Sequence, residues 1–298
     1  MNPLYTIIIP HYNAPELLMR CLGSIPVRQD VQVIVVDDCS PDAGNYLKKY
    51  PELSRPFLEL YSTEKGGSAG RARNVGLQHA RGRWCLFADA DDYYEDGFLD
   101  KIGSELDDSL EILYFNISGT GLRAQLHQKI FELYLTNHDE TEVRYHIWEP
   151  WNKVFSLQFI FDNQLRFEEV PVGNDAMFCL KASRAARHYR IIDQQLYFLT
   201  DNMGSISHRA LSFEREMDYT KVRTRINRFM AEQGLELRYG YHLFSISRFL
   251  RFKREYGWCN CLQYASYISR HYGIFRALIY NRTRLMFQKA HPDLIYCD

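Results

Sequence analysis

The stretch RWCLFADADDYYE, residues 83–95, decides the fold that the sequence predicts. Trp84 to Ala88 are apolar without helical spacing, which indicates a strand buried on both faces. Three carboxylates, Asp89, Asp91 and Asp92, follow it at once. The carboxyl ends of parallel strands are where open α/β sheets bind ligands. An Asp-x-Asp pair at such an end can share a divalent cation, although a charged, solvated turn has the same composition.

Length and composition bound the class of protein. The 298 residues are 46% hydrophobic and 24% charged, which is enough for one large α/β core and a smaller appendage. The net charge of −1 excludes a uniformly basic nucleic-acid-binding protein. The seven cysteines are scattered and odd in number, as in proteins of reducing compartments. No secretory signal or membrane-spanning segment is recognisable, so we expect a cytosolic protein.

Three further strands and two helices are predicted before residue 83. The predicted strands are Tyr5–Ile9, Val31–Val36 and Phe57–Tyr61, and the helices begin at Pro15 and Ser68. The second of these strands also ends in carboxylates, Asp37 and Asp38. Alternation of strands and helices over the first 95 or so residues predicts a parallel sheet with right-handed crossovers.

The pattern after Tyr94 is mixed. We expect helices over Phe98–Leu106 and Leu122–Tyr134, a strand over Leu110–Ser118, a rigid aromatic segment over Glu149–Phe155, a helix from Ala176 and a short strand over Tyr197–Leu199. From Leu211 the chain is predicted to be helical. We therefore expect an α/β domain over residues 1–210 and a helical extension over residues 211–298.

Several side chains near the predicted strand ends suit a nucleotide. Tyr12 can stack on a flat base or pack in the core, and Asp38 can accept a nucleobase N–H or cap a turn. Lys65, Arg71 and Arg73 stand beside four glycines, as a diphosphate site requires. The dinucleotide and P-loop signatures are missing. A nucleoside diphosphate with a divalent cation satisfies all of these groups together.

Six segments resemble one family. They are TIIIPHYN (6–13), VVDDCSPD (35–42), GGSAGRARNVGLQHARG (66–82), LFADADD (86–92), WNKVF (151–155) and GNDAMF (173–178). Together they resemble the family 2 glycosyltransferases of GT-A fold, bacterial inverting enzymes that build surface polysaccharide. The resemblance covers roughly residues 4 to 210. It implies a Rossmann-like mixed, mainly parallel sheet with flanking helices, in the cytoplasm or at the inner face of the cytoplasmic membrane.

The resemblance also implies the reaction and its donor site. A sugar would pass from a nucleoside diphosphate sugar, UDP-linked first and GDP-linked second, to a hydroxyl of a glycan or lipid-linked acceptor. Tyr12 and Asp38 would contact the base. The donor site as a whole would comprise Pro10, Tyr12, Asn13, Asp38, Lys65, Arg71, Arg73, Asp89 and Ala90.

The same resemblance implies a metal and a catalytic base. Mn²⁺ or Mg²⁺ would bind Asp91 directly, with Asp89 and His208 completing the metal and diphosphate site. Asp175 would be the base, and Asn174 stands where the family usually has Glu. Asn174 would lie at the acceptor. From its residue type alone, Trp151 can stack on an acceptor sugar or pack in the protein interior.

The C-terminal extension is basic and aromatic. Between Arg251 and Lys289 there are eight Lys or Arg residues against one acid, Glu255. Interleaved Tyr, Phe and Trp fit helices at an anionic membrane surface, but a packed helical cap or a homodimer face would use the same residues. Nothing else in the chain suits recognition of a nucleic acid.

Two other functions fit parts of the sequence. Haloacid-dehalogenase-like phosphatases also carry an Asp-x-Asp after a strand, but theirs follows the first strand of the core, whereas this pair starts at Asp89. A non-catalytic nucleotide-sugar-binding scaffold for a partner glycosyltransferase is the second alternative, and the departure at Asn174 favours it.

Overall fold

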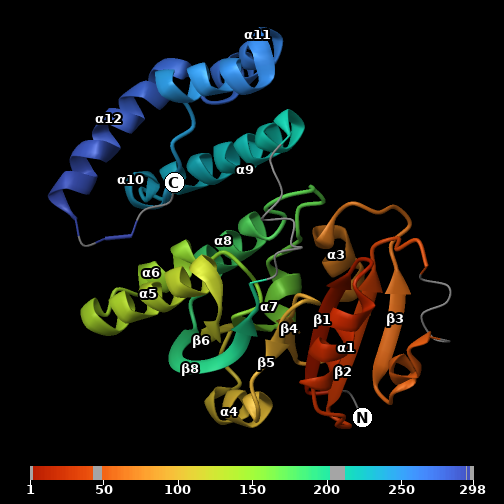
Figure 1. The fold of residues 1–298 in the computed structure, drawn as a ribbon. Helices are drawn as coiled ribbons and strands as arrows, with labels where there is room; N and C mark the ends of the chain where they lie inside the picture. Colours follow the sequence, from red (N-terminus) through yellow and green to blue (C-terminus); the bar gives the residue numbers. More distant parts are fainter. Residues whose placement is uncertain (1–2, 43–48, 202–211, 293, 296–298) are drawn as a thin grey trace. The chain divides into compact units, whose positions relative to one another are not determined.

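The chain divides into two compact units. The computed structural model describes residues 3–42, 49–201, 212–292 and 294–295. The units are Met1–His208 and Arg209–Asp298. The described part of the first is an eight-stranded mixed sheet flanked by helices, and that of the second is helical (Figure 1).

Four parallel strands form the N-terminal half of the sheet. They are β1 (Tyr5–His11), β2 (Val31–Asp37), β3 (Leu58–Ser62) and β4 (Trp84–Phe87). Their order is β3-β2-β1-β4, and every neighbouring pair is parallel. The four strands predicted from the first 95 or so residues, and their parallel pairing, are therefore confirmed.

Both faces of β1, β2 and β4 are covered, which explains the continuous apolar sequence of these three strands, whereas β3 is only partly buried. Ile7 and Ile9 belong to the same core cluster as Leu18 of α1 (Pro15–Gly23) and Phe98 of α4 (Phe98–Glu105). Ile8 points to the other face, toward α3 (Ala69–His79). All three isoleucines have no exposed surface.

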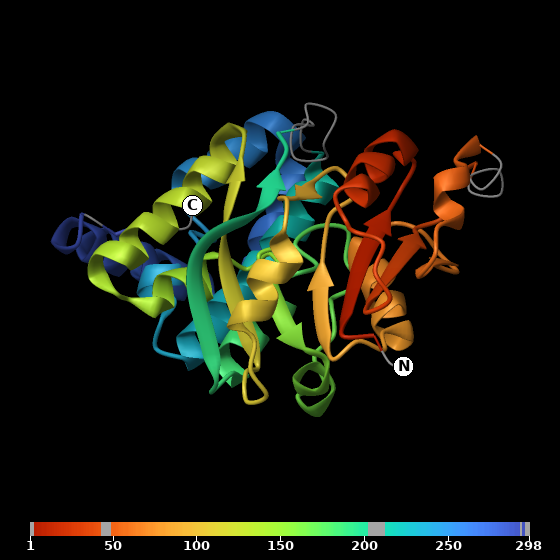
Figure 2. The same ribbon diagram turned by 90° about the horizontal axis from the view of Figure 1, so that it is seen from below.

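The second half of the sheet departs from the parallel pattern. β7 (Lys153–Ser156) lies antiparallel between β4 and β6 (Ile112–Gly119). The long β8 (Tyr189–Leu199) runs parallel to β6 and pairs antiparallel with β5 (Tyr93–Tyr94). Figure 2 shows β8, coloured green, curving across the sheet beside β6. The segment predicted as rigid and aromatic thus contains a strand that the sequence pattern did not reveal.

Helices cover this half as well. They are α5 (Gly121–Asn137), α6 (Glu140–His146), α7 (Leu157–Asp162) and α8 (Ala176–Ala185), and a short 3₁₀ helix, η2, spans Pro51–Ser54. α5 packs on β6, and α6 packs against both α5 and α8. The predicted helices corresponding to α5 and α8 are confirmed, whereas α6 and α7 were not predicted.

The second unit consists of helices along its described length. They are α9 (Phe213–Glu232), α10 (Glu236–Tyr239), α11 (Ile246–His271) and α12 (Ile274–Ala290). Gly257 bends α11, because its φ of 81° is not helical. Within the described ranges, no helix has the length and apolar character needed to cross a membrane.

Gly70 sets the position of α3 against the segment that precedes α8. A Cβ atom at this position would lie 2.2 Å from the carbonyl oxygen of Glu168 and 2.9 Å from the Cβ of Asn174. Backbone atoms cannot move aside as a flexible side chain would. The absence of a side chain at residue 70 therefore lets two distant parts of the chain touch.

We predict that Gly70→Ala lowers the melting temperature of the protein. Overpacking of this kind costs about 1–3 kcal/mol, and each kcal/mol shifts the midpoint of a unit of this size by roughly 2–4 °C. Thermal unfolding followed by circular dichroism measures the change. Gly23→Ala is the matched control, because nothing lies within 4 Å of a Cβ there. Equal midpoints for the two variants would contradict the close approach.

Candidate active site

The strand order singles out one edge of the sheet. β2 and β3 lie on one side of β1 and β4 lies on the other, so successive connections leave the carboxyl edge in opposite directions. Ligands bind at such topological switch points in open α/β sheets. The segments that leave β1 and β4 there are Tyr12–Asn13 and Ala88–Asp92.

The end of β1 presents an aromatic side chain. Tyr12 is 60% exposed, so its ring is available to a flat ligand. Asn13 has a φ of 47°, and its N–H donates to Ser40 Oγ at 2.7 Å. Pro10 is buried within β1 opposite Val36. A hydrogen bond thus joins the turn after β1 to the turn after β2, while the side chain of Tyr12 remains exposed to solvent.

Asp38 is buried beneath the glycine-rich loop. Its Oδ2 accepts hydrogen bonds from the N–H groups of Gly67 and Ser68 at 2.7 and 2.8 Å. Its Oδ1 accepts from the hydroxyl of Thr63 at 2.8 Å. This carboxylate therefore holds the loop before α3 in place, and Ser68 caps that helix through its hydroxyl.

The three basic residues of the glycine-rich region differ in their surroundings. Lys65 is exposed. Arg71 pairs through Nε with Glu169 Oε2 at 2.9 Å. Lys65 is therefore the member of this set whose side chain stands in solvent, while Arg71 already has a carboxylate partner.

Arg73 is a buried cation between two motifs. Its Nη2 donates to Asp89 Oδ1 at 2.6 Å, and its Nη1 donates to Asn174 Oδ1 at 2.7 Å. The guanidinium also lies over the ring of Phe167, 5.3 Å from the centroid. Only 3% of Arg73 is exposed. Its two hydrogen bonds hold the side chains of Asp89 and Asn174 in place.

The acids after β4 lie close enough to repel one another. Burial and the neighbouring Asp89 raise the pKa of Asp91. Burial, Asp89 and Asp91 raise the pKa of Asp92 well above its usual range. Asp92 accepts hydrogen bonds from the Tyr197 hydroxyl at 3.0 Å and the Thr200 N–H at 2.7 Å. Asp92 is thus a structural acid, whereas Asp89 and Asp91 remain partly exposed.

Asp175 precedes α8 but does not cap it, since its side chain makes no capping hydrogen bond. Burial raises its pKa to about 6, and the charges of Glu149 and Asp89 act in the same direction. Arg73 and Arg123 oppose them. Asp175 therefore shares one electrostatic environment with Asp89 after β4.

An ion pair that the sequence analysis missed borders this environment. Glu149 is buried, and Arg123 of α5 donates to it through Nη2 at 2.8 Å. Burial raises the pKa of Glu149, but His127 and Arg123 outweigh burial and hold the pKa below its usual range. Arg123 also lowers the pKa values of Asp91 and Asp175. No short motif joins Arg123 to Glu149, so sequence alone carried no signal for the pair.

Trp151 has the packing role rather than the predicted acceptor contact. It is 1% exposed and stacks on Tyr197 with ring centroids 5.4 Å apart, while His127 lies 4.9 Å away. The buried ammonium of Lys153 donates to the carbonyl oxygen of Ile147 at 2.9 Å, which helps to fix this segment. The indole of Trp151 is therefore covered by protein and cannot stack on a sugar in this arrangement.

Asp89 and Asp91 are suited to a divalent cation. Their mutual repulsion, which raises the pKa of Asp91, would be relieved by a cation between them. No three His, Cys, Asp or Glu side chains of the described chain form a complete cage. Two carboxylates with phosphate oxygens and water nevertheless match the usual Mg²⁺ site. His208, the third predicted contact, lies outside the described residues.

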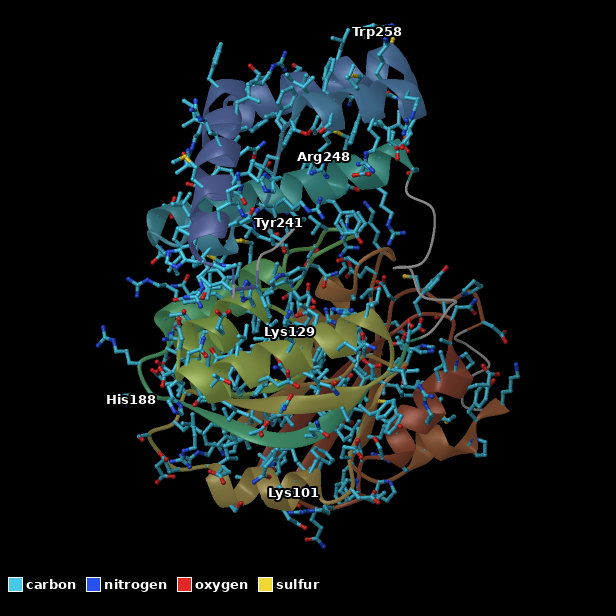
Figure 3. All side chains as sticks on the ribbon, turned by 60° about the vertical axis from the view of Figure 1, so that its left-hand side comes forward. Lys101, Lys129, His188, Tyr241, Arg248 and Trp258 are labelled. Atoms are coloured by element: carbon cyan, nitrogen blue, oxygen red, sulfur yellow. The ribbon has the colours of Figure 1, made fainter. Side chains whose placement is uncertain are left out.

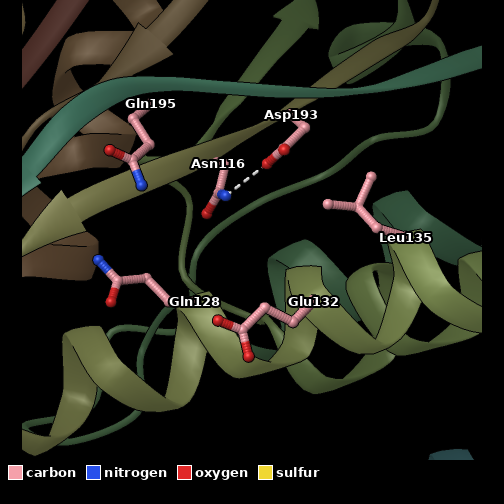
Figure 4. Close-up of a pocket in the computed structure, with 6 residues that line it drawn as sticks. All are labelled: Asn116, Gln128, Glu132, Leu135, Asp193 and Gln195. Carbon is pink, nitrogen blue, oxygen red and sulfur yellow. Dashed lines mark hydrogen bonds between the residues drawn. The ribbon is translucent and has the colours of Figure 1, made fainter.

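A separate hollow lies between α5 and the strands β6 and β8 (Figure 4). Its volume is about 540 Å³, and it is lined by Asn116, Gln128, Glu132, Leu135, Asp193 and Gln195. Asn116 donates to Asp193 across its wall at 2.6 Å. None of the predicted site residues lines this hollow, so it is distinct from the acids at the strand ends.

Comparison with known proteins identifies the family of residues 6–148. Residues 6–148 match the model of the family described as Glycosyl transferase family 2. The uncharacterized glycosyltransferase EpsJ of Bacillus subtilis is 27% identical over 70% of this chain and 64% of EpsJ. The poly(ribitol-phosphate) β-N-acetylglucosaminyltransferase TarS of Staphylococcus aureus is 28% identical over 73% of this chain and 39% of TarS. The chain thus spans less than two thirds of either relative.

Solved structures show the same fold. Residues 1–349 of S. aureus TarS in complex with UDP-GlcNAc align with a TM-score of 0.67 and 24% identity, over 90% of this chain and 81% of that one. A mannosyltransferase from Pyrobaculum calidifontis in complex with GDP-Man and Mn²⁺ aligns with a TM-score of 0.53 and 16% identity, over 98% and 82%. Residues 6–148 are therefore a family 2 glycosyltransferase domain, and the chain has the GT-A fold.

Proposed function

We propose that the chain is an inverting glycosyltransferase of bacterial surface polysaccharide synthesis. It would move a sugar from a UDP-sugar to a hydroxyl of a glycan or lipid-linked acceptor. The observation that carries the proposal is Asp175, a carboxylate with a pKa raised to about 6 that shares its surroundings with Asp89. The relatedness to TarS and its UDP-GlcNAc complex supports this choice of donor.

The donor would bind along the carboxyl edge of the sheet. The exposed ring of Tyr12 would stack on the base, beside Asn13 and Asp38. The exposed ammonium of Lys65 would meet the diphosphate near the N-terminus of α3, where backbone N–H groups favour anions. Arg71, which is held by its ion pair with Glu169, would add positive charge at the same end of the site.

Asp89 and Asp91 would hold Mn²⁺ or Mg²⁺ together with the diphosphate. When bound, the cation supplies positive charge that stabilises the leaving nucleoside diphosphate. Arg73 would keep Asp89 in one orientation through their 2.6 Å ion pair. The Mn²⁺ complex of the Pyrobaculum mannosyltransferase supports this cofactor.

Asp175 would act as the general base. Its carboxylate takes the proton of the acceptor hydroxyl while that oxygen forms a bond to the anomeric carbon. The bond from this carbon to the phosphate oxygen breaks on the opposite face, and the electron pair leaves with the nucleoside diphosphate. Attack from the face opposite the leaving group inverts the anomeric configuration. Arg73 and Arg123 would keep Asp175 ionised near neutral pH, because both lower its pKa.

We predict that Asp175→Asn removes transfer and spares donor binding. Loss of a positioned base costs about 10²–10⁴-fold in rate. Sugar transfer and release of UDP are measured with a panel of UDP-sugars, and UDP binding is followed by thermal shift. If Asp175→Asn keeps near-normal transfer, Asp175 is not the base. If the wild type releases no UDP with any donor and acceptor yet binds UDP-sugars, the scaffold function replaces the enzyme.

The pH dependence tests the electrostatics around this base. Because the base must be deprotonated, kcat/KM should fall as the pH drops through about 6, the pKa of Asp175. Arg123→Gln removes a charge that lowers this pKa, so the acidic limb should move to higher pH. Arg123→Lys should restore its position. Arg83→Gln is the control, because Arg83 pairs with the exposed Asp108 and precedes β4, at the opposite end of that strand from Asp89. An unmoved limb in Arg123→Gln would show that Arg123 does not act on the base.

Metal-linked donor binding tests Asp91. We expect UDP to raise the melting temperature more with Mn²⁺ than without it, since a ligand at a hundredfold its Kd stabilises the folded state by about 2.7 kcal/mol. Asp91→Asn should abolish the extra stabilisation that Mn²⁺ adds. Asp96→Asn is the matched control, because Asp96 is an exposed acid five residues further along the chain. A Mn²⁺ increment of unchanged size in Asp91→Asn would remove Asp91 from the metal site.

A further inference from the structure

Large apolar side chains gather on the outer faces of the last two helices. In the described part of the chain, nine of the eighteen exposed large apolar side chains lie between Ile246 and Met286. Single exposed apolar residues are common on proteins, but dense groups of them mark surfaces that bind a partner or a membrane. We therefore ask what covers the exposed apolar residues of these two helices.

α12 carries the more regular of the two groups. Its exposed apolar residues are Phe275, Leu278, Ile279, Leu285 and Met286, with exposed fractions of 82, 37, 67, 52 and 66%. Their spacing of three, four and seven residues puts them on one face of the helix. The residues of the opposite face are Ala277, Tyr280 and Arg284, and all three are buried. α12 therefore has an apolar outer face in addition to its packed inner face.

The helical unit packs without this outer face. The hydroxyl of Tyr280 donates to the carbonyl oxygen of Glu236 at 2.9 Å. Tyr264 of α11 stacks on Phe252 with ring centroids 4.3 Å apart, and both are fully buried. These contacts tie α12 to α10 and close the core around α11. The exposed side chains of α12 are consequently surplus to the packing of their own unit.

Cations accompany the apolar residues. Arg282 and Lys289 follow the same helical spacing as the exposed face, and the sequence of α12 contains no Asp or Glu. On α11 the ammonium of Lys253 lies 4.2 Å from the ring centroid of Trp258, which is 57% exposed. Figure 3 shows Trp258 pointing outward from α11. A tryptophan beside a lysine suits the boundary between lipid headgroups and acyl chains.

The charge pattern selects among possible occupants. A second copy of this chain would bring Arg282, Lys289 and their equivalents together without any acid of α12 to neutralise them. Anionic lipid headgroups neutralise these cations, and the acyl region accepts the apolar side chains. No described helix can span the bilayer, so the contact would be peripheral.

We propose that α12 lies on the surface of an anionic bilayer. Phe275, Ile279 and their neighbours enter the boundary of the headgroups, and Arg282 and Lys289 contact lipid phosphates. This surface extends the function beyond sugar transfer, because it would hold the enzyme where lipid-linked acceptors are. It does not depend on the catalytic assignment.

Vesicle sedimentation of the full chain tests the surface. We expect binding to phosphatidylcholine vesicles that contain about one third phosphatidylglycerol, and weaker binding to pure phosphatidylcholine. Phe275→Ser with Ile279→Ser should weaken binding about tenfold or more. Arg282→Glu with Lys289→Glu should abolish the preference for phosphatidylglycerol. Circular dichroism shows whether each variant is folded, which is expected because all four side chains are exposed.

Matched controls are available in the first unit. Phe161→Ser removes a 50% exposed aromatic side chain of α7. Lys101→Glu with Lys129→Glu makes the same change in net charge at exposed positions (Figure 3). Both controls should bind vesicles like the wild type. If they lose binding to the same degree as the α12 variants, the effect is one of overall charge or hydrophobicity and the proposed surface is wrong.

Three further results would overturn the proposal. The first is that the wild type binds neither kind of vesicle. The second is that the α12 variants bind like the wild type. The third is that the wild type binds no vesicles and is a dimer, which Phe275→Ser with Ile279→Ser converts to a monomer. The last result would assign the face to contact between copies. UDP release measured without vesicles reports on transfer separately, so failure of the membrane surface and failure of the proposed reaction are distinguishable.

Discussion

One buried guanidinium holds the parts of the candidate site together. Arg73 of α3 donates to Asp89 after β4 and to Asn174 before α8, and it is almost fully buried. A buried charge that loses its partner is costly, about 3–5 kcal/mol in measured cases. The two segments are far apart in sequence, and Arg73 bonds to both. The separation of Asp89 from Asp175 therefore depends on this side chain.

The same cation also bonds to Asn174, which stands where the family usually has Glu. A glutamate there would compete with Asp89 for Arg73 and would add a negative charge beside Asp175. That charge would raise the pKa of Asp175, which burial, Glu149 and Asp89 already raise. The neutral Asn174 accepts one hydrogen bond from Arg73 and leaves the full charge of the guanidinium to act on the two aspartates.

The predictable and unpredictable parts of the structure differ in a physical way. β1, β2 and β4 are continuous apolar runs that end in polar turns, so local pattern was enough to find them. β7 is only four residues long and antiparallel, and it lies in an aromatic segment without a clear alternation of apolar and polar residues, so the local pattern did not indicate a strand. The sequence could not decide whether Trp151 packs in the core or contacts a ligand, because its burial depends on Tyr197 and His127 from other elements. Residues 123 and 149 meet only in the folded chain.

The anchoring of the glycine-rich loop by Asp38 limits what that carboxylate can read. A carboxylate offers about four lone-pair directions, and Thr63, Gly67 and Ser68 occupy three of them. A base that reaches Asp38 can therefore satisfy it with a single imide-type N–H. Uracil carries such a group at N3 and guanine at N1, whereas adenine and cytosine carry none. The amino groups of adenine and cytosine also supply an N–H, so the proposed contact of Asp38 with the base would not select one base by itself, and selection would fall to other groups of the donor site.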